Sequence, residues 1–136
     1  APLAVYDSRL REMNFGEWEG CTYAQLQDNP RYRSWIDDPA AVTPPGGEPW
    51  KAFEARLDSF MAELGQAAEG EVQQMNAGTG AGPHFRVLLV THGGVIRQLL
   101  AHSTPGMSFR AAATPDPGTA AVMKLRRHQG QWQSCT

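Results

Sequence analysis

A strand, a glycine-rich turn and a helix follow one another within eighteen residues of this chain, and this segment restricts the fold more than any other. Residues Phe85–Val90 (FRVLLV) are apolar on both alternating faces, which is typical of a central strand covered on both sides. The run Thr91–Gly94 (THGG) ends this strand. The apolar residues after it have the spacing of one helix face: Val95, Ile96, Leu99 and Leu100. Because strand, turn and helix form half of a βαβ unit, we predict an α/β fold.

Further helices are predicted from apolar spacing and capping residues. One apolar stripe predicts a helix of about four turns, formed by Trp50, Phe53, Leu57, Phe60, Met61 and Leu64; we interpret this stripe as core. Thr22 and Gln25 have the form of a capping box that opens a short helix through Leu26. Asn29 and Pro30 have the form of an N-cap and first helical residue. The next helix continues at helical spacing with Tyr32, Trp35 and Ile36.

The C-terminal part is predicted to be β-structure. Thr119–Leu125 (TAAVMKL) has the composition of a second strand. Gly130–Gln133 is predicted to be the return arm of a hairpin that turns near His128–Gly130.

Two stretches have the composition of loops. Pro39–Pro49 is stiffened by prolines and is predicted to be ordered. Gly70–Pro83 is rich in glycine and small polar residues, so we expect a mobile loop at about 70–83. Neither stretch is interpreted as a domain boundary, and residues 1–136 are predicted to form one domain or part of one.

Composition excludes several classes of function. Twelve Lys and Arg against 14 Asp and Glu give a formal charge of −2, and no basic run is present, so a nucleic-acid partner is not expected. No apolar run approaches the about 20 residues that cross a bilayer, so no membrane segment is predicted. Cys21 and Cys135 lie far apart without a C-x-x-C motif, which favours reduced thiols in a cytoplasmic protein.

The turn Thr91–Gly94 is the first candidate site. Backbone N–H groups at a helix N-terminus attract anions, and glycine lets a phosphate approach closely. His92 beside that phosphate could donate to its oxygens, although a strand-end histidine that only bonds a neighbouring carbonyl is the alternative. Arg97 is interpreted as a solvated or ion-paired residue, and its closeness to the turn leaves a role in the site open.

The second candidate site is the segment Arg9–Gly20 (RLREMNFGEWEG). Carboxylates alternate there with aromatic residues and glycines. A carboxyl beside apolar rings retains its proton more readily and can act as a proton donor. The alternative is a solvated surface segment.

Three motifs together resemble the histidine phosphatase superfamily, in the branch of the cofactor-dependent phosphoglycerate mutases. They are L-R-E-M-N-F-G-E-W-E-G, the later G-G-E-P, and V-T-H-G-G-V-I-R. Within that branch the chain looks most like the alpha-ribazole phosphatases of cobalamin biosynthesis. The resemblance implies a three-layer α/β/α, phosphoglycerate mutase-like fold with a mostly parallel sheet, incomplete at its N-terminal side.

The resemblance also implies a phosphohistidine mechanism and gives roles to particular residues. Glu12 matches the acid and base, His92 the second active-site histidine, and the Gly93 N–H a backbone contact to the phosphoryl oxygens. Further substrate contacts are expected from Phe15 and Trp18, and from Glu48 in a cover formed by Pro44–Trp50. No metal or other cofactor is implied.

The chain departs from the family pattern in one motif. The nucleophilic histidine of the family belongs to an Arg-His-Gly motif, and this sequence has no such run. Arg127–Gly130 (RHQG) comes nearest, but the hairpin turn explains it. We therefore expect a truncated gene product, a cleaved fragment or one part of a split protein, with the N-terminal strands supplied by a missing segment or a second chain.

Three functions follow from these observations. The first is a phosphomonoester phosphatase for a small-molecule phosphate ester, similar to the alpha-ribazole-5'-phosphate phosphatases. The second is an inactive phosphate-binding or interaction module without the nucleophile, in which case this chain alone is not an enzyme. The third is a phosphoglycerate mutase-like phosphotransferase.

Overall fold

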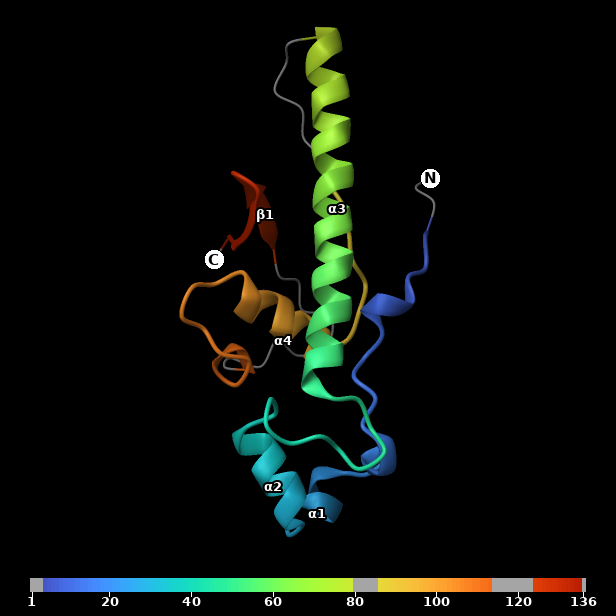
Figure 1. Cartoon of the computed structure of the whole chain (residues 1–136), viewed down its shortest axis with the longest axis vertical. Coiled ribbons are helices and arrows are strands. Elements are labelled where there is room, and N and C mark those ends of the chain that lie inside the picture. Colours follow the sequence, from blue (N-terminus) through green and yellow to red (C-terminus); the bar gives the residue numbers. More distant parts are fainter. Residues whose placement is uncertain (1–3, 80–85, 114–123, 136) are drawn as a thin grey trace.

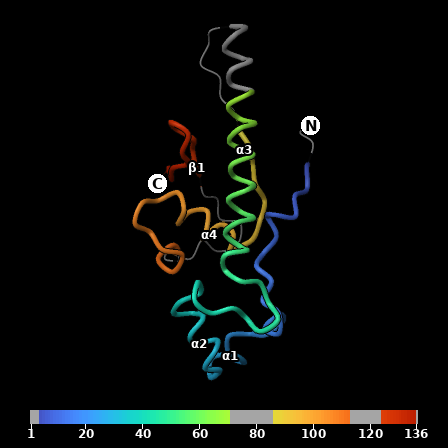
Figure 2. The backbone as a smooth tube through the Cα atoms, in the orientation of Figure 1, coloured from blue at the N-terminus to red at the C-terminus, as the bar shows by residue number. Residues whose placement is uncertain are grey.

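The long helix α3 organises the computed structural model, which describes residues 4–79, 86–113 and 124–135. This helix spans Trp50–Thr79, and its 30 residues correspond to about 45 Å. The other helices lie beside or beyond its N-terminal part, and the C-terminal hairpin lies beside its middle (Figure 1). Residues 4–7 run on one side of α3 and the C-terminal hairpin lies on the other (Figure 2).

The remaining helices are short. The α-helices are α1 (Tyr23–Leu26), α2 (Pro30–Asp37) and α4 (Gly93–His102). Single 3-10 turns form η1 (Ser8–Leu10), η2 (Gly16–Trp18) and η3 (Ala111–Ala113). Within the described ranges, no helix combines the length and apolar character that crossing a membrane requires.

The capping signals in the sequence are confirmed. Thr22 Oγ1 accepts from the Gln25 N–H, and the Gln25 side chain accepts from the Thr22 N–H, which is a complete capping box. The Asn29 side chain accepts from two N–H groups of α2, and Pro30 is its first residue. These local hydrogen bonds supply acceptors for N–H groups that would otherwise have no partner at the start of each helix.

The apolar stripe of α3 is core, as predicted. The buried cluster joins this stripe to α4 and to the segment after η1, with members Met13, Trp50, Phe53, Leu57, Met61, Val95 and Leu99. Phe53, Leu57 and Val95 are almost fully buried, and each such side chain stabilises the fold by about 1.5–3 kcal/mol relative to exposure.

Helix α3 is longer than predicted. It continues through Thr79, so residues 70–79 of the loop expected at 70–83 are helical, and residues 80–83 lie outside the described residues. The sequence there offers no apolar face, but alanine, glutamate and glutamine favour continuation of a helix that is already formed.

The sheet of the described residues is a two-stranded antiparallel hairpin of β1 (Leu125–His128) and β2 (Gln131–Ser134). Gln129 and Gly130 form its turn with φ of 51° and 77°, the left-handed pair that a two-residue hairpin requires. The predicted hairpin and turn are confirmed. The strand expected over Thr119–Leu125 overlaps β1 only at Leu125, and its residues 119–123 lie outside the described residues.

The predicted central strand is not a strand in the described structure. Residues 86–90 of the expected Phe85–Val90 strand have no sheet partner, and Phe85 lies outside the described residues. Leu88 and Val90 are 80% and 83% exposed, whereas Leu89 packs against the core. A strand exists only where a second strand accepts its backbone bonds, and the described residues provide none here. The expected mostly parallel sheet is therefore absent from this part of the chain, which is mainly helical.

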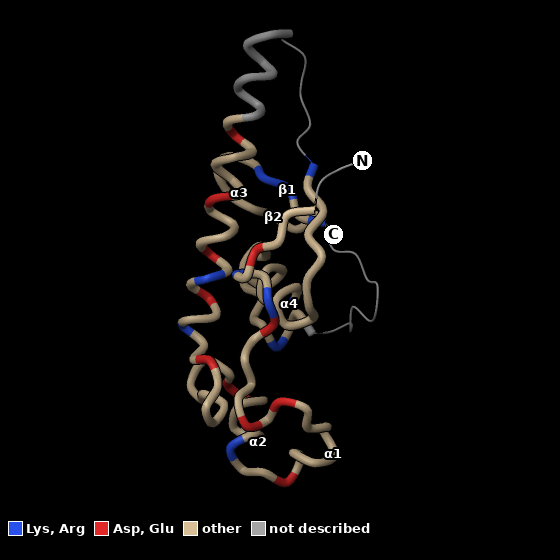
Figure 3. Tube along the Cα trace, turned by 90° about the vertical axis from the view of Figure 1, so that its right-hand side faces the viewer, with Lys and Arg blue, Asp and Glu red and all other residues tan. Residues whose placement is uncertain are grey.

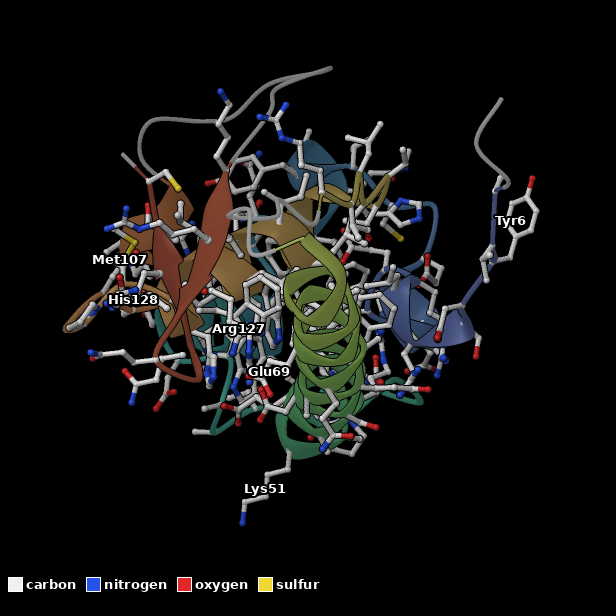
Figure 4. All side chains as sticks on the ribbon, turned by 90° about the horizontal axis from the view of Figure 1, so that it is seen from above. Tyr6, Lys51, Glu69, Met107, Arg127 and His128 are labelled. Carbon is white, nitrogen blue, oxygen red and sulfur yellow. The ribbon has the colours of Figure 1, made fainter. Side chains whose placement is uncertain are left out.

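Contacts between side chains fix the hairpin against α3. Arg127 of β1 forms an ion pair with Glu69 of α3 at 2.8 Å, and Figure 4 shows the two side chains beside each other. The guanidinium passes over Gly65, where a Cβ would collide with it. Trp132 Nε1 donates to the Met61 carbonyl at 3.2 Å. Acidic and basic residues both occur along α3 (Figure 3), so ion pairs are available on its outer surface.

Candidate functional site

Glu12 lies at the N-terminus of α4, although 82 positions separate it from Gly94 in the sequence. Its Oε2 accepts from the Gly94 N–H at 3.0 Å, and its Oε1 accepts from the Met13 N–H at 2.9 Å. A carboxylate is favoured there because the first N–H groups of a helix have no partner within the helix. The structure therefore brings the predicted acid–base residue to the predicted anion-binding turn.

The two glycines of that turn differ in their surroundings. A Cβ on Gly94 would collide with Glu12 Oε1, so only glycine allows this close approach. Gly93 has no atom within 4 Å of the position that its Cβ would take. Gly93 is exposed, and the helix end beside it is open to solvent.

His92 is the N-cap residue of α4. Its backbone is extended, with φ −113° and ψ 162°, and its side chain makes no capping hydrogen bond. The imidazole is exposed. The neighbouring Thr91 Oγ1 donates to the Leu10 carbonyl at 2.5 Å, which ties the turn to the segment that carries Glu12. His92 and Glu12 thus lie at the same helix end.

Arg56 of α3 holds the Glu12 segment in place. Its Nη1 donates to the carbonyls of Arg9 and Arg11 at 2.6 and 2.7 Å, and its Nη2 donates to the Glu12 carbonyl at 3.2 Å. This role of Arg56 was not predicted from the sequence, since an arginine on an amphipathic helix normally faces solvent. The available signal was its spacing, because Arg56 lies three positions after the buried Phe53 and one before the buried Leu57, on the same face of the helix.

Glu48 is the ion-pair partner of Arg56. Its carboxylate lies 2.8 Å from Arg56 Nε, and it accepts from the Asn14 N–H at 3.3 Å. Burial raises the pKa of the Glu48 carboxyl, but the hydrogen bonds from Arg56 and Asn14 and the positive charges of Arg56 and Arg11 together lower this pKa by more, so it lies below its ordinary value. Both carboxylate oxygens are thus engaged within the chain, and the substrate contact expected of Glu48 stays a prediction.

A cavity of about 120 Å³ lies beside Glu12. Its walls come from the Glu12 segment, α2, α3, α4 and the segment after α4, with lining residues Glu12, Met13, Phe15, Trp35, Trp50, Phe53, Gly94, Arg97 and Phe109. Of the predicted site residues, Glu12 and Phe15 line it. The lining does not include Trp18, Glu48, His92 or Gly93.

The two aromatic residues predicted to flank the substrate lie at different depths, and only Phe15 lines the cavity. Phe15 lines the cavity and packs edge-on against Trp35 at 5.6 Å between ring centroids. Trp18 is buried behind it and packs edge-on against Tyr32 and Trp35 at 5.3 and 6.1 Å. Trp18 therefore supports the cavity wall from outside.

The expected cover Pro44–Trp50 packs directly on the segment that carries Phe15. The Glu48 N–H donates to the Asn14 carbonyl at 2.8 Å, and the Glu17 N–H donates to the Pro45 carbonyl at 2.9 Å. Gly16 has φ +57°, and a Cβ there would collide with the Pro45 carbonyl. The two segments are thus joined by backbone contacts that a side chain at position 16 would prevent.

A second hollow, of about 530 Å³, opens between α2 and the following loop. It is lined by Pro30, Arg31, Ser34, Ala41, Val42 and Thr43. Arg31 donates to the Thr43 carbonyl, and no carboxylate or imidazole lines this hollow. It therefore has no side chain suited to acid–base catalysis, unlike the cavity beside Glu12. In the part of the chain that the structure describes, no group of three or more His, Cys, Asp or Glu residues could hold a metal ion.

Comparison with known proteins identifies the family to which the chain is similar. The profile of the histidine phosphatase superfamily (branch 1) matches residues 3–135. Glucosyl-3-phosphoglycerate phosphatase of Mycobacterium tuberculosis H37Rv is 41% identical over 97 residues, which cover 70% of this chain and 40% of that protein. Adenosylcobalamin/alpha-ribazole phosphatase of Escherichia coli K12 is 30% identical over 128 residues, which cover 92% of this chain and 50% of that protein.

These relatives are longer than the chain. The chain spans about half of their length or less. No solved structure gave a significant match. Because the family profile matches residues 3–135, which is nearly the whole chain, the chain belongs to the histidine phosphatase superfamily, branch 1.

Proposed function

We propose that this chain supplies the acid–base group and part of the phosphate-binding surface of a phosphomonoester phosphatase. One observation carries the proposal: the Glu12 carboxylate lies against the Gly94 N–H at the N-terminus of α4. A proton donor and a helix end suited to an anion thus lie together, and phosphoryl transfer needs both. The phosphatase relatives support the same reaction type.

In this mechanism the ester phosphoryl group lies at the N-terminus of α4. The Gly93 N–H and the His92 imidazole donate to its oxygens and stabilise the charge of the transition state. A histidine attacks phosphorus, the bond to the ester oxygen breaks, and the protonated Glu12 carboxyl transfers its proton to that oxygen. The alcohol then leaves.

The second half of the reaction returns the site to its starting state. The Glu12 carboxylate takes a proton from a water molecule, whose oxygen attacks phosphorus as the bond to histidine breaks. Inorganic phosphate is released and Glu12 is protonated again. The attacking histidine belongs, in the family pattern, to an Arg-His-Gly motif that these 136 residues do not contain.

The decisive experiment measures hydrolysis of p-nitrophenyl phosphate. It compares the chain with a form extended at its N-terminus by any Arg-His-Gly segment that the upstream coding DNA encodes in frame. In the active form, Glu12→Gln and His92→Ala should each lower kcat by about 10²-fold or more. Full turnover in either variant would contradict the roles given to these residues.

Matched controls come from the same chain. Glu17→Gln changes an exposed glutamate of the same segment, and His128→Ala changes an exposed histidine in the hairpin. Both should retain turnover within about 2-fold, since surface changes have small effects. Loss of activity in His128→Ala would instead favour the Arg127–Gly130 run as a nucleophile motif.

Two alternatives have their own outcomes. Phosphate binding without turnover in every form would favour a phosphate-binding module that lacks catalysis. Transfer between phosphoglycerates in the presence of a bisphosphate primer would favour the mutase. Among phosphatase substrates, an alpha-ribazole phosphate and a phosphoglycerate ester are the two classes that the names of the relatives suggest.

A further inference from the structure

Side chains bind the four consecutive backbone carbonyls that lead to Glu12. Three of these groups accept from the Arg56 guanidinium of α3 at 2.6, 2.7 and 3.2 Å, namely the carbonyls of Arg9, Arg11 and Glu12. The remaining carbonyl, that of Leu10, accepts from Thr91 Oγ1 at 2.5 Å. Residues 11–15 belong to no helix or strand, so no regular ladder of backbone bonds defines their path. The position of Glu12 therefore depends on two side chains that are distant in the sequence.

The Arg56 guanidinium uses its full set of donors. Its Nε and Nη2 bind the two carboxylate oxygens of Glu48, and with the three carbonyls this makes five hydrogen bonds. A guanidinium has five N–H donors in one plane. Because this fork is rigid, the Glu48 carboxylate fixes the direction in which Arg56 presents its remaining donors to the carbonyls.

Thr91 connects the same segment to the turn at the start of α4. It directly precedes His92, the N-cap residue of that helix. Its hydroxyl holds the backbone before Glu12, while the Glu12 carboxylate accepts from the Gly94 N–H of the same helix end. Neither Arg56 nor Thr91 is among the residues that line the cavity beside Glu12. Any effect of these two side chains on the reaction would therefore pass through Glu12.

We propose that Arg56 and Thr91 are positioning residues, which hold the Glu12 carboxyl where it can transfer a proton to the ester oxygen. The inference rests on the proposed function, in which Glu12 is the proton donor, but the contact itself can be measured without turnover. A shift of about 1 Å in a catalytic group can lower a rate by about 10²-fold. Loss of either positioning residue should therefore lower kcat and leave KM nearly unchanged.

The Gly94 amide proton reports the position of Glu12 in this chain, because it binds Glu12 Oε2. Its chemical shift in proton–nitrogen spectra at neutral pH should change when Glu12→Gln removes the carboxylate. In an Arg56→Lys or a Thr91→Val background, Glu12→Gln should change this shift by less than about half as much, because the carboxylate is already displaced. Equal changes in all three backgrounds would overturn the proposal.

Both background variants are conservative. Arg56→Lys retains the positive charge beside Glu48, but a single ammonium lacks the planar fork that reaches three carbonyls. Thr91→Val replaces the hydroxyl with a methyl group of similar size and removes the bond to the Leu10 carbonyl. The two variants lie on different elements, so a result that they share cannot come from a local fault at either position.

A matched control and a folding check come from the same chain. Lys51→Met removes an exposed cation from α3. In this background Glu12→Gln should change the Gly94 shift as much as it does in the parent chain. Circular dichroism measures the helix content of each variant. The indole N–H signal of Trp132, which donates to the Met61 carbonyl, shows whether the hairpin is still docked.

The active, N-terminally extended form tests the consequence for catalysis. Arg56→Lys and Thr91→Val should each lower kcat for p-nitrophenyl phosphate about 10-fold, with KM within about 2-fold of the parent value. In a Glu12→Gln background neither substitution should lower kcat further, because effects that pass through one group are not additive. A loss of the same size in that background, or a rise in KM alone, would overturn the proposal.

The two measurements separate this inference from the proposed function. Turnover that requires Glu12, together with a Gly94 shift that is independent of Arg56 and Thr91, would overturn the inference and leave the phosphatase proposal standing. Turnover that survives Glu12→Gln would overturn the proton-donor role and, with it, the positioning role. If no form turns over, the proposed function is wrong, and the Gly94 shift alone then decides whether these side chains position Glu12.

Discussion

Arg56 and Glu48 form a two-point ion pair, with Nε 2.8 Å from Oε2 and Nη2 3.0 Å from Oε1. The two side chains are only 10% and 8% exposed. The same guanidinium also binds the carbonyls of the segment that carries Glu12. One arginine therefore connects α3, the cover segment and the proposed proton donor.

Arg56→Met should lower the free energy of unfolding by about 3–5 kcal/mol, because it leaves a buried carboxylate without its partner. Urea denaturation at pH 7 measures this change. Arg126→Met is the control and should fall within about 0.5 kcal/mol of the parent chain. A loss below about 1 kcal/mol for Arg56→Met would mean that water replaces the guanidinium.

The ion pair should also make stability depend on pH. The pKa of the Glu48 carboxyl in the folded chain is below its ordinary value of 4.5. Its stabilising contribution is therefore complete above pH 4.5 and is lost as the pH falls through the lowered folded pKa. The urea midpoint of the parent chain should exceed that of Glu48→Gln at pH 7. This difference should shrink as the pH falls to 3. A constant difference across this range would contradict the assignment.

Gly94→Ala should separate Glu12 from α4, since a Cβ at position 94 collides with the carboxylate. We expect a loss of about 1.5–3 kcal/mol in unfolding free energy, the usual value of a hydrogen bond to a charged group. Gly93→Ala has open space and should be neutral or stabilising by up to about 1 kcal/mol. Equal effects of the two substitutions would show that the Glu12 contact contributes no stability.

Gly65 and Gly70 form a matched pair within α3. Gly65→Ala should displace Arg127 and weaken hairpin docking, at a cost of about 1–3 kcal/mol. Gly70 is exposed with no atom near its Cβ position, so Gly70→Ala should stabilise the helix by about 0.5–1 kcal/mol. Thermal unfolding of both variants compares them directly. Destabilisation by Gly70→Ala would indicate a contact that this geometry lacks.

Local signals in the sequence predicted local structure well. Thr22 with Gln25 and Asn29 with Pro30 specify helix starts through bonds that span three residues or fewer. The turn at Gln129–Gly130 follows from the left-handed backbone that these positions accept. The link between Glu12 and the α4 turn agrees with the family resemblance, although 82 positions separate the partners.

Features that depend on distant partners could not be predicted in this way. The Phe85–Val90 composition specifies a strand only if neighbouring strands are present, and the described residues offer none. The interior role of Arg56 depends on carbonyls 44 to 47 positions away. The cavity likewise joins Trp35, Arg97 and Phe109 from three separate parts of the chain. No spacing rule relates such residues.

The exposed stretch 86–90 has a practical consequence for work with the isolated chain. Val87, Leu88 and Val90 face solvent, and residues 86–90 form no sheet pairing with other described residues. Short β-prone apolar stretches with free backbone groups are templates for intermolecular strand addition, and lysine is a natural gatekeeper against it. The light scattered per unit of protein concentration should therefore rise as preparations of the chain are concentrated. Leu88→Lys should slow aggregation during storage without changing the Glu12 site.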